Sequence, residues 1–255
     1  MGSSVRAFFL ATAFLIATIA LALVQMTVVL LRLPVTREVL PQFYHKLCLK
    51  LLGFRITVVG KISEKPSTLF VANHTSYLDI PILGSLIKGA FVAKSEVRKW
   101  PLFGWLAVLQ NTVFIERKTN KIENQCNEIA QRLHAKYNVI LFPEGTTSDG
   151  NRVLNFKSSL FDLAIDSTNE DLYIQPVTIT YVKLDDIPIG RNLRHLFAWY
   201  GDMSLAPHLW QVFKIGRTGI TVTFHHPILA SDYKSRKTLA NHCHGEVVKG
   251  FEAAI

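Results

Sequence analysis

The sequence predicts an α/β protein with a mixed, largely parallel central sheet, flanked by helices and preceded by an N-terminal membrane-anchoring helix. Two observations lead to this prediction. A long run without charged residues opens the chain, and after it short apolar segments of strand length alternate with segments of helical periodicity. Because no internal repeat or Gly/Ser linker divides the remainder, we expect an anchor over residues 1–35 and one α/β domain over residues 36–255.

The opening run contains no charged residue between Arg6 and Arg32. It is longer than the roughly 20 apolar residues that cross a bilayer and longer than the apolar core of a cleavable signal peptide. We interpret it as a membrane anchor, with an embedded helix that does not span the bilayer as the second interpretation. More basic residues follow the run than precede it, so the positive-inside rule places the domain on the cytoplasmic side of the inner membrane.

The net charge of +9 indicates an anionic partner or a solvated basic surface. Neither zinc-finger spacing nor an RNA-binding aromatic signature accompanies the basic residues, so the sequence does not favour a nucleic-acid partner. An anionic membrane surface is the simpler explanation beside an apolar anchor. The three cysteines, Cys48, Cys126 and Cys243, lie far apart and agree with a reducing compartment.

The first helix after the anchor is predicted from Arg37 to Leu52, and Gly53 ends it. Its apolar residues recur at helical spacing and form a stripe of Leu40, Phe43, Leu47 and Leu51. We expect this helix to lie on the membrane or to pack under the anchor. Alternating apolar and polar residues then predict a half-buried strand over Phe54–Val58.

The rest of the domain alternates between strands and helices. The predicted strands are Ser67–Ala72, Phe91–Ala93, Thr112–Ile115, Asn138–Phe142, Asp171–Val182 and Gly219–His225. The predicted helices are one that opens at Ile80, Asn120–Lys136, Leu160–Asp166 and one from Asp232 onward that buries Leu239, Cys243 and Val247. Pro176 interrupts an apolar strand, which predicts a sheet edge or a bulge beside a site.

The segment Asn73–Asp79 contains an imidazole and a carboxylate five residues apart, directly after a predicted strand. On a continuous helix such residues point about 140° apart. His74 and Asp79 therefore meet only if His74 lies in the loop and Asp79 in the first helical turn. A histidine backed by a carboxylate is a minimal general base. The alternative is a capping pair of Ser76 and Asp79, with His74 an ordinary loop residue.

A second polar segment, Phe142–Gly150, follows another predicted strand. Ligands of α/β sheets bind outside the carboxyl ends of strands, and this loop offers glycines, hydroxyls and backbone N–H groups to a polar head group. A plain surface turn is the alternative. Arg117 and Lys94, each at the end of a predicted strand, are candidates to bind an anionic group, and a solvent-exposed charge is the alternative for each.

Other reactive residues show no comparable pattern. The chain lacks the G-x-S-x-G elbow of serine hydrolases, and Ser76 is too close to His74 along the chain to be its nucleophile. The groups His225-His226 and His242-Cys243-His244 lack zinc-ligand spacing. We therefore expect neither a metal site nor a cofactor.

Taken in order, H-x4-D, F-x-x-R, F-P-E-G-T and a strand with a proline resemble the glycerolipid acyltransferase family, which includes the bacterial 1-acyl-glycerol-3-phosphate acyltransferases. The resemblance spans roughly residues 46–228. It implies an enzyme that moves a fatty acyl chain from acyl-CoA or acyl carrier protein to the free hydroxyl of a lysolipid. By matching positions, the resemblance implies that His74 is the catalytic base and that Asp79 orients it. It also implies that the acceptor is bound by Arg117, Glu144, Gly145 and Thr146. We further expect backbone N–H groups at the start of the helix that follows His74 to stabilise the oxyanion.

One position departs from the enzymes of this family that act on lysophosphatidic acid. Those enzymes often have a basic residue directly after E-G-T, where this chain has Thr147. Either the next cations, Arg152 and Lys157, bind the acceptor phosphate instead, or the acceptor has no phosphomonoester. The first case, with 1-acyl-sn-glycerol-3-phosphate as acceptor and phosphatidic acid as product, is our main expectation.

The second case is a lyso-ornithine lipid O-acyltransferase, which residues 147–152 and 199–203 resemble. A non-catalytic lipid-binding membrane protein is the remote alternative. The His74–Asp79 pair argues against it, because binding alone needs no base.

Overall fold

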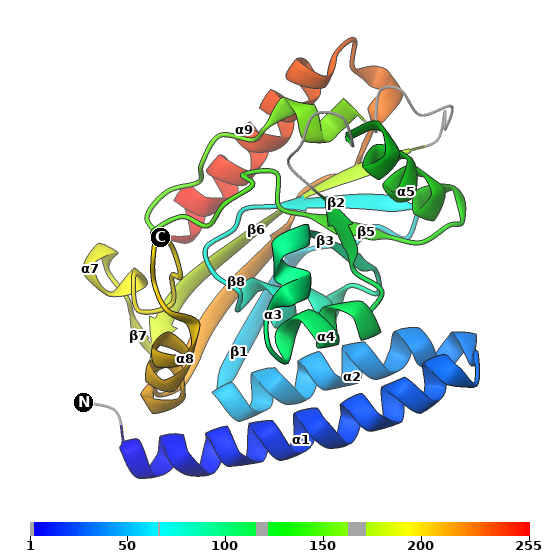
Figure 1. The fold of residues 1–255 in the computed structure, drawn as a ribbon. Helices are drawn as coiled ribbons and strands as arrows, with labels where there is room; N and C mark the ends of the chain where they lie inside the picture. Colours follow the sequence, from blue (N-terminus) through cyan, green and yellow to red (C-terminus); the bar gives the residue numbers. More distant parts are fainter. Residues whose placement is uncertain (1–2, 66, 116–121, 163–171) are drawn as a thin grey trace.

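A computed structural model of the 255-residue chain describes residues 3–65, 67–115, 122–162 and 172–255 (Figure 1). These residues form a nine-stranded mixed sheet with helices on both faces, which confirms the predicted α/β class. The strands are β1 (Phe54–Gly60), β2 (Thr68–Ala72), β3 (Ala90–Lys94), β4 (Val113–Ile115), β5 (Val139–Leu141), β6 (Tyr173–Leu184), β7 (Ile187–Pro188), β8 (Thr218–Phe224) and β9 (Ile228–Leu229).

The helices follow the predicted pattern with three additions. They are α1 (Ser4–Leu30), α2 (Pro34–Leu52), α3 (Asp79–Leu86), α4 (Phe103–Leu109), α5 (Ile122–His134), α7 (Arg191–Arg194), α8 (Leu205–Lys214) and α9 (Arg236–Ala254), with 3-10 turns η1 (Ser95–Lys99), η3 (Ser158–Phe161) and η4 (Ala230–Asp232). The periodicity does not predict α4, α7 or α8, because α4 has only seven residues, α7 has only four, and α8 contains a proline. The predicted helix Leu160–Asp166 coincides in part with η3, and residues 163–166 lie outside the described residues.

The sheet has the order β1-β8-β6-β2-β5-β3-β4. Strands β6, β2, β5, β3 and β4 run parallel to one another, whereas β8 is antiparallel to β6 and parallel to β1. The carboxyl ends of β2, β5 and β3 therefore meet at one edge of the sheet. The loops that follow Ala72, Leu141 and Lys94 become neighbours there, and these loops carry most of the candidate site residues.

Two apolar layers hold the sheet between helices. One face packs against α1, α2, α3 and α8 through residues such as Leu52, Ile82 and Phe213. The other face packs against α5 and α9 through residues such as Leu133 and Cys243. In Figure 1 the α1–α2 pair and the α5–α9 pair accordingly lie on opposite sides of the sheet.

Helix α1 has the length and composition of a membrane span, yet it is attached to the domain near both ends. Near its start, the Arg6 guanidinium donates a hydrogen bond to the backbone carbonyl of Ile215, which follows α8. Near its end, Gln25 Nε2 donates to the carbonyl of Leu109 in α4 at 3.2 Å. Helix α1 therefore runs along the base of the domain beside α2 (Figure 1).

Helix α2 ends at Gly53 as predicted, with the glycine in the left-handed conformation at φ 74°. The predicted apolar stripe is not its buried face: Phe43 is 54% exposed, and the buried positions are His45, Cys48, Leu49 and Leu52. The buried face of α2 is set by its packing between α1 and α3 rather than by the spacing of its apolar residues. Gly84 of α3 leaves room for the His45 ring.

The expectation that Pro176 marks a sheet edge or a bulge is wrong. β6 is a central strand between β2 and β8, and its register shift lies at Tyr181/Lys183. Pro176 lies where the partner of β6 changes, between the β9 pairing at Tyr173–Ile174 and the β8 pairing from Val177 onward. A residue without an N–H group is tolerated there because neither ladder needs a donor from it.

Replacing Gly84 with Ala should destabilise the protein by about 1–3 kcal/mol, the usual result of overpacking a core. A Cβ at this position would lie 2.3 Å from the His45 ring. Thermal unfolding in detergent measures the effect. The matched control is Gly245→Ala in α9, where an added Cβ meets no atom within 4 Å and should stabilise the helix slightly. Equal stability of the Gly84 variant and wild type would contradict the prediction.

Candidate active site

The turn between β2 and α3 is attached to the neighbouring strand β6. Asn73, the first residue after β2, is buried and donates its Nδ2 to the carbonyl of Ile179 at 2.9 Å, while its Oδ1 accepts the Ile179 N–H at 2.8 Å. A side-chain amide thus extends the sheet hydrogen bonding by one residue. His74 therefore starts from a fixed backbone position.

His74 and Asp79 form the predicted pair. His74 Nδ1 lies 2.9 Å from Asp79 Oδ2, with His74 in the loop and Asp79 at the start of α3. The same Oδ2 atom accepts the backbone N–H groups of Thr75 at 2.7 Å and Ser76 at 2.9 Å. The alternative of a Ser76–Asp79 capping pair is met only in part. Asp79 accepts the Ser76 N–H, but the Ser76 hydroxyl has no hydrogen-bond partner among the described residues and Leu78 occupies the N-cap position.

The other carboxylate oxygen, Asp79 Oδ1, accepts the phenol hydroxyl of Tyr181 on β6 at 2.9 Å. Sequence reasoning missed Tyr181, whose only signal is a hydroxyl-bearing ring within an apolar strand. Asp79 is fully buried, so these four donors compensate the cost of removing its charge from water. A carboxylate acceptor at Nδ1 means that the neutral imidazole carries its proton there and has its lone pair on Nε2.

The N–H groups of Thr75 and Ser76 donate to Asp79, and at the start of α3 the N–H groups of Asp79 and Ile80 donate to backbone carbonyls of the turn. An oxyanion contact at the helix start therefore stays a prediction. The His74 ring packs face to face on Phe142, with centroids 4.0 Å apart and planes 15° apart. The side chain remains 18% exposed. One ring nitrogen is thus held inside the protein, and the edge of the ring that carries Nε2 is left for a substrate.

The loop after β5 binds the backbone of His74 on both sides. Glu144 Oε1 accepts the His74 N–H at 2.8 Å, and the Ser148 N–H donates to the His74 carbonyl at 2.9 Å. Glu144 is buried. Burial raises the pKa of Glu144 to about 8, against the lowering effect of the N–H groups of His74 and Leu154. The Glu144 side chain thus supports the His74 turn from the protein side.

The remaining loop residues lie in the open part of the site. Gly145 has φ 65°, and a Cβ there would lie 2.7 Å from Lys157 Nζ, so the lysine ammonium lies against the glycine backbone. Lys157 also closes the loop through its N–H, which donates to the Pro143 carbonyl at 2.9 Å. Thr146 is exposed and Thr147 is half-buried.

The predicted substrate-binding cations lie in different surroundings. Lys157 meets the Glu-Gly-Thr loop, whereas Arg152 is exposed further along the same loop. Lys94 ends β3, which pairs with β5 on the same sheet edge. Arg117 lies outside the described residues.

Two further segments meet at Thr75. The Trp199 N–H donates to the Thr75 carbonyl at 3.0 Å, and a Cβ at Gly150 would lie 3.2 Å from the Thr75 methyl group. Residues 147–152 and 199–203, which are distant in sequence, therefore both pack against the turn that carries His74. The arrangement contains an accessible imidazole nitrogen, a buried carboxylate behind it and a hydroxyl-rich loop with a lysine beside it, which suits proton abstraction from a bound hydroxyl.

Comparisons with known proteins agree with this chemistry. A family model described as Acyltransferase matches residues 55–180. The chain is 43% identical over 221 residues to a lyso-ornithine lipid O-acyltransferase of Brucella abortus, covering 85% of this chain and 83% of that protein. It is 33% identical over 163 residues to a 1-acyl-sn-glycerol-3-phosphate acyltransferase of Neisseria gonorrhoeae, covering 63% and 60%.

The fold has a solved counterpart. A crystal structure of the 1-acyl-sn-glycerophosphate acyltransferase of Thermotoga maritima superposes with a TM-score of 0.66, covering 98% of this chain and 93% of that chain, at 23% identity. At this identity the likeness concerns the fold alone, and the sequence relatives supply the rest. With a relative above 40% identity over most of both chains, and with the H-x4-D and F-P-E-G-T motifs meeting at His74, this protein belongs to the acyltransferase family.

Proposed function

We propose that His74 is the catalytic base of this lysolipid acyltransferase, and that Asp79 and Tyr181 keep it oriented. The observation that carries the proposal is the 2.9 Å contact of Asp79 with Nδ1, which leaves Nε2 as the acceptor. Nε2 takes the proton of the lysolipid hydroxyl as its oxygen attacks the thioester carbonyl carbon. The carbon–sulfur bond then breaks, and the thiol leaves with the proton that the imidazolium returns. Acyl-CoA or acyl carrier protein is the donor.

We infer that the acceptor is a lyso-ornithine lipid. Relatives with that name match this chain at 43%, 40% and 38% identity, above the 33% of the Neisseria gonorrhoeae relative. The site supports the same choice, because Thr147 stands where a phosphate-binding cation is expected. The two segments that resemble lyso-ornithine lipid acyltransferases both pack on the Thr75 end of the His74 turn.

Lysophosphatidic acid is the second candidate acceptor, and one observation favours it. Lys157 Nζ lies against Gly145 in the Glu-Gly-Thr loop, within reach of a head group bound there. A single ammonium is also suited to a carboxylate, such as the one that ornithine carries. The cation is therefore compatible with both acceptors, and the residue at position 147 distinguishes them.

We propose that the enzyme acts at the cytoplasmic surface of the inner membrane, with α1 embedded rather than spanning. A spanning helix would project from the domain, whereas α1 is bonded to α8 near one end and to α4 near the other. Its outward side carries large exposed apolar residues that suit the acyl region of one leaflet: Val5, Phe8, Phe9, Leu15, Ile16, Ile19, Leu23, Val24 and Met26. This placement keeps the site beside lipid substrates.

Replacing His74 with Ala should lower acyl transfer by about 10²–10⁴-fold, the usual contribution of a general base. The measurement is release of thiol from a thioester donor in the presence of lysolipid. His226→Ala is the control, because His226 is an exposed histidine away from the site and its removal should leave turnover unchanged. Near-normal turnover by a folded His74 variant would exclude the mechanism.

Glu144 should make unfolding depend on pH. Its folded pKa of about 8 exceeds the ordinary value of 4.5, so the folded state binds a proton that the unfolded state releases between these values. The contribution to stability is complete below pH 4.5 and is lost as the pH rises through 8. Glu144→Gln should therefore gain stability relative to wild type as the pH is raised from 5 to 8, as measured by thermal unfolding. A difference that does not change with pH would contradict the assignment.

The acceptor assignment predicts that wild type acylates lyso-ornithine lipid in preference to lysophosphatidic acid when both are offered. Thr147→Arg should shift the preference toward lysophosphatidic acid by about tenfold, since one charge-assisted contact is worth about 1.5 kcal/mol. Thr147→Val is the control of similar shape without charge. Faster turnover of lysophosphatidic acid by wild type would favour the second candidate.

A further inference from the structure

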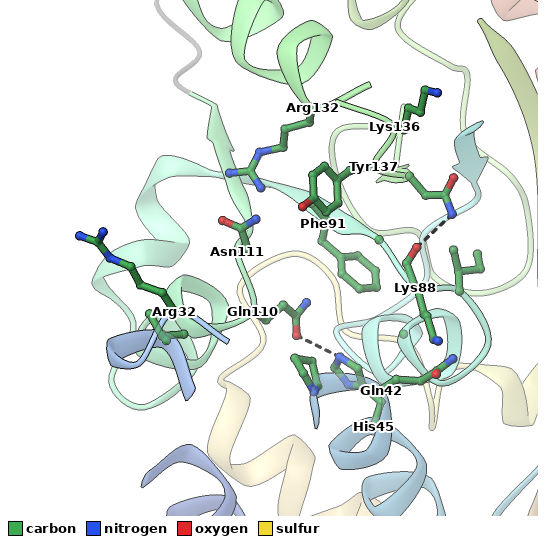
Figure 2. Close-up of a pocket in the computed structure, with 17 residues that line it drawn as sticks. Arg32, Gln42, His45, Lys88, Phe91, Gln110, Asn111, Arg132, Lys136 and Tyr137 are labelled. Atoms are coloured by element: carbon green, nitrogen blue, oxygen red, sulfur yellow. Dashed lines mark hydrogen bonds between the residues drawn. The ribbon is translucent and has the colours of Figure 1, made fainter. Parts of the chain in front are cut away.

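A cavity of about 740 Å³ lies in the described part of the chain, and His74 is not among the residues that line it. Its floor contains His45, Gly84 and Phe91, and the His45 ring is held by Gln110, with Nε2 and Oε1 2.9 Å apart. Figure 2 shows this hydrogen bond at the base of the cavity, with Arg132 and Lys88 on different sides of it. The volume is that of a ligand site rather than a packing defect.

Four cations and no carboxylate are found among the described residues that line the cavity. The cations are Arg32, Lys88, Arg132 and Lys136. Arg132 pairs with Glu128 at 3.3 Å, whereas the other three form no ion pair within the described residues. Side-chain amides of Gln42, Gln110, Asn111 and Asn138 complete the polar lining. Such a lining favours an anion, and phosphate is the group that arginine and lysine together bind best.

The cavity is distinct from the catalytic site. Gly89–Phe91 and Tyr137–Asn138 bring the amino ends of β3 and β5 to its wall. His74 and Glu144 instead follow the carboxyl ends of β2 and β5. The two sites therefore lie at opposite ends of these strands, with stacked rings between them: Phe91 of the cavity lies 6.4 Å from Phe142, whose ring lies 4.0 Å from that of His74.

The position of the cavity identifies the kind of molecule that carries the phosphate. Val29 and Arg32 at the end of α1 form part of its rim. Directly beside them, Leu30 is 79% exposed, Leu31 62% and Leu33 45%. An apolar surface next to a basic cavity matches an amphiphile, with acyl chains along the leucines and a phosphate among the cations.

The helix dipole alone does not explain this arrangement of cations. Arg32, Lys88 and Lys136 follow the ends of α1, α3 and α5, where a cation is favoured by the helix dipole. That effect acts on each helix separately. It does not account for three helix ends meeting around one cavity whose described lining holds no acidic residue.

We propose that this cavity binds the phosphate head group of an anionic membrane phospholipid, as a second lipid site that holds the α1–α2 end of the domain on the bilayer. The bound lipid is not a substrate. Its role is to hold the end of α1 at the bilayer, so that α1 lies along the membrane and the catalytic site stays beside it.

The test compares two triple variants of equal net charge in the full chain. Arg32→Gln/Lys88→Gln/Lys136→Gln removes the three unpaired cations of the cavity. Lys61→Gln/Lys234→Gln/Lys237→Gln removes three exposed lysines that do not line it. Binding of submicellar dihexanoyl phosphatidylglycerol is measured by calorimetry, with dihexanoyl phosphatidylcholine and coenzyme A as comparison ligands. Flotation with phosphatidylglycerol-containing vesicles and acyl transfer to soluble short-chain acceptors are measured on the same proteins.

The cavity variant should lose about a hundredfold in affinity for the phosphatidylglycerol probe, since each cation near an anionic surface contributes about a fivefold factor. The control variant should bind like wild type, and both should retain acyl transfer to soluble acceptors. An equal loss of affinity in both variants would overturn the proposal, because it would show that the probe binds through general charge attraction. Tight binding of coenzyme A that only the cavity variant loses would overturn it in favour of a donor site. Because binding is read without turnover, the result does not depend on the proposed acceptor.

Discussion

The buried Asp79 carboxylate is the constraint on which the rest of the site depends. A charge with no exposure to water is tolerated only when its oxygens are fully hydrogen-bonded, and Asp79 obtains its donors from the His74–Ser76 turn and from Tyr181 of β6. Satisfying one carboxylate therefore requires the turn, the start of α3 and the neighbouring strand to be in their final positions. The same requirement fixes which imidazole nitrogen carries the proton. Folding and preparation of the base are thus one event.

The loop after β5 extends this dependence to the acceptor site. It holds His74 through a side chain at Glu144 and a backbone N–H at Ser148, so under the proposed roles a change in this loop would affect both the acceptor site and the base. The Trp199 segment adds a third contact at the Thr75 carbonyl. Three segments that are distant in sequence thus meet at the turn that carries His74.

The parallel sheet separates two kinds of lipid contact. Carboxyl ends of strands collect the reactive groups, and amino ends of β3 and β5 line the basic cavity at the end of α1. Helices α1 and α2 cover one face of the sheet between these edges and expose apolar side chains outward. In the proposed placement, this arrangement keeps the active site beside the membrane.

The sequence by itself determined what is local: the uncharged first helix, the alternation of strands and helices, and a histidine and an aspartate five residues apart that meet across a turn. Short-range spacing carries that information because neighbours in the chain cannot avoid one another. Only the tertiary structure decided what is distant. Tyr181 donates a hydrogen bond to Asp79 from 102 residues away in the sequence. Helix α2 buries a face other than its apolar stripe, because Gly84 of α3 leaves room for the His45 ring. Pro176 lies within a central strand, because the pairing of β6 changes there from β9 to β8. Such pairings depend on strand order and helix packing, which no local pattern encodes.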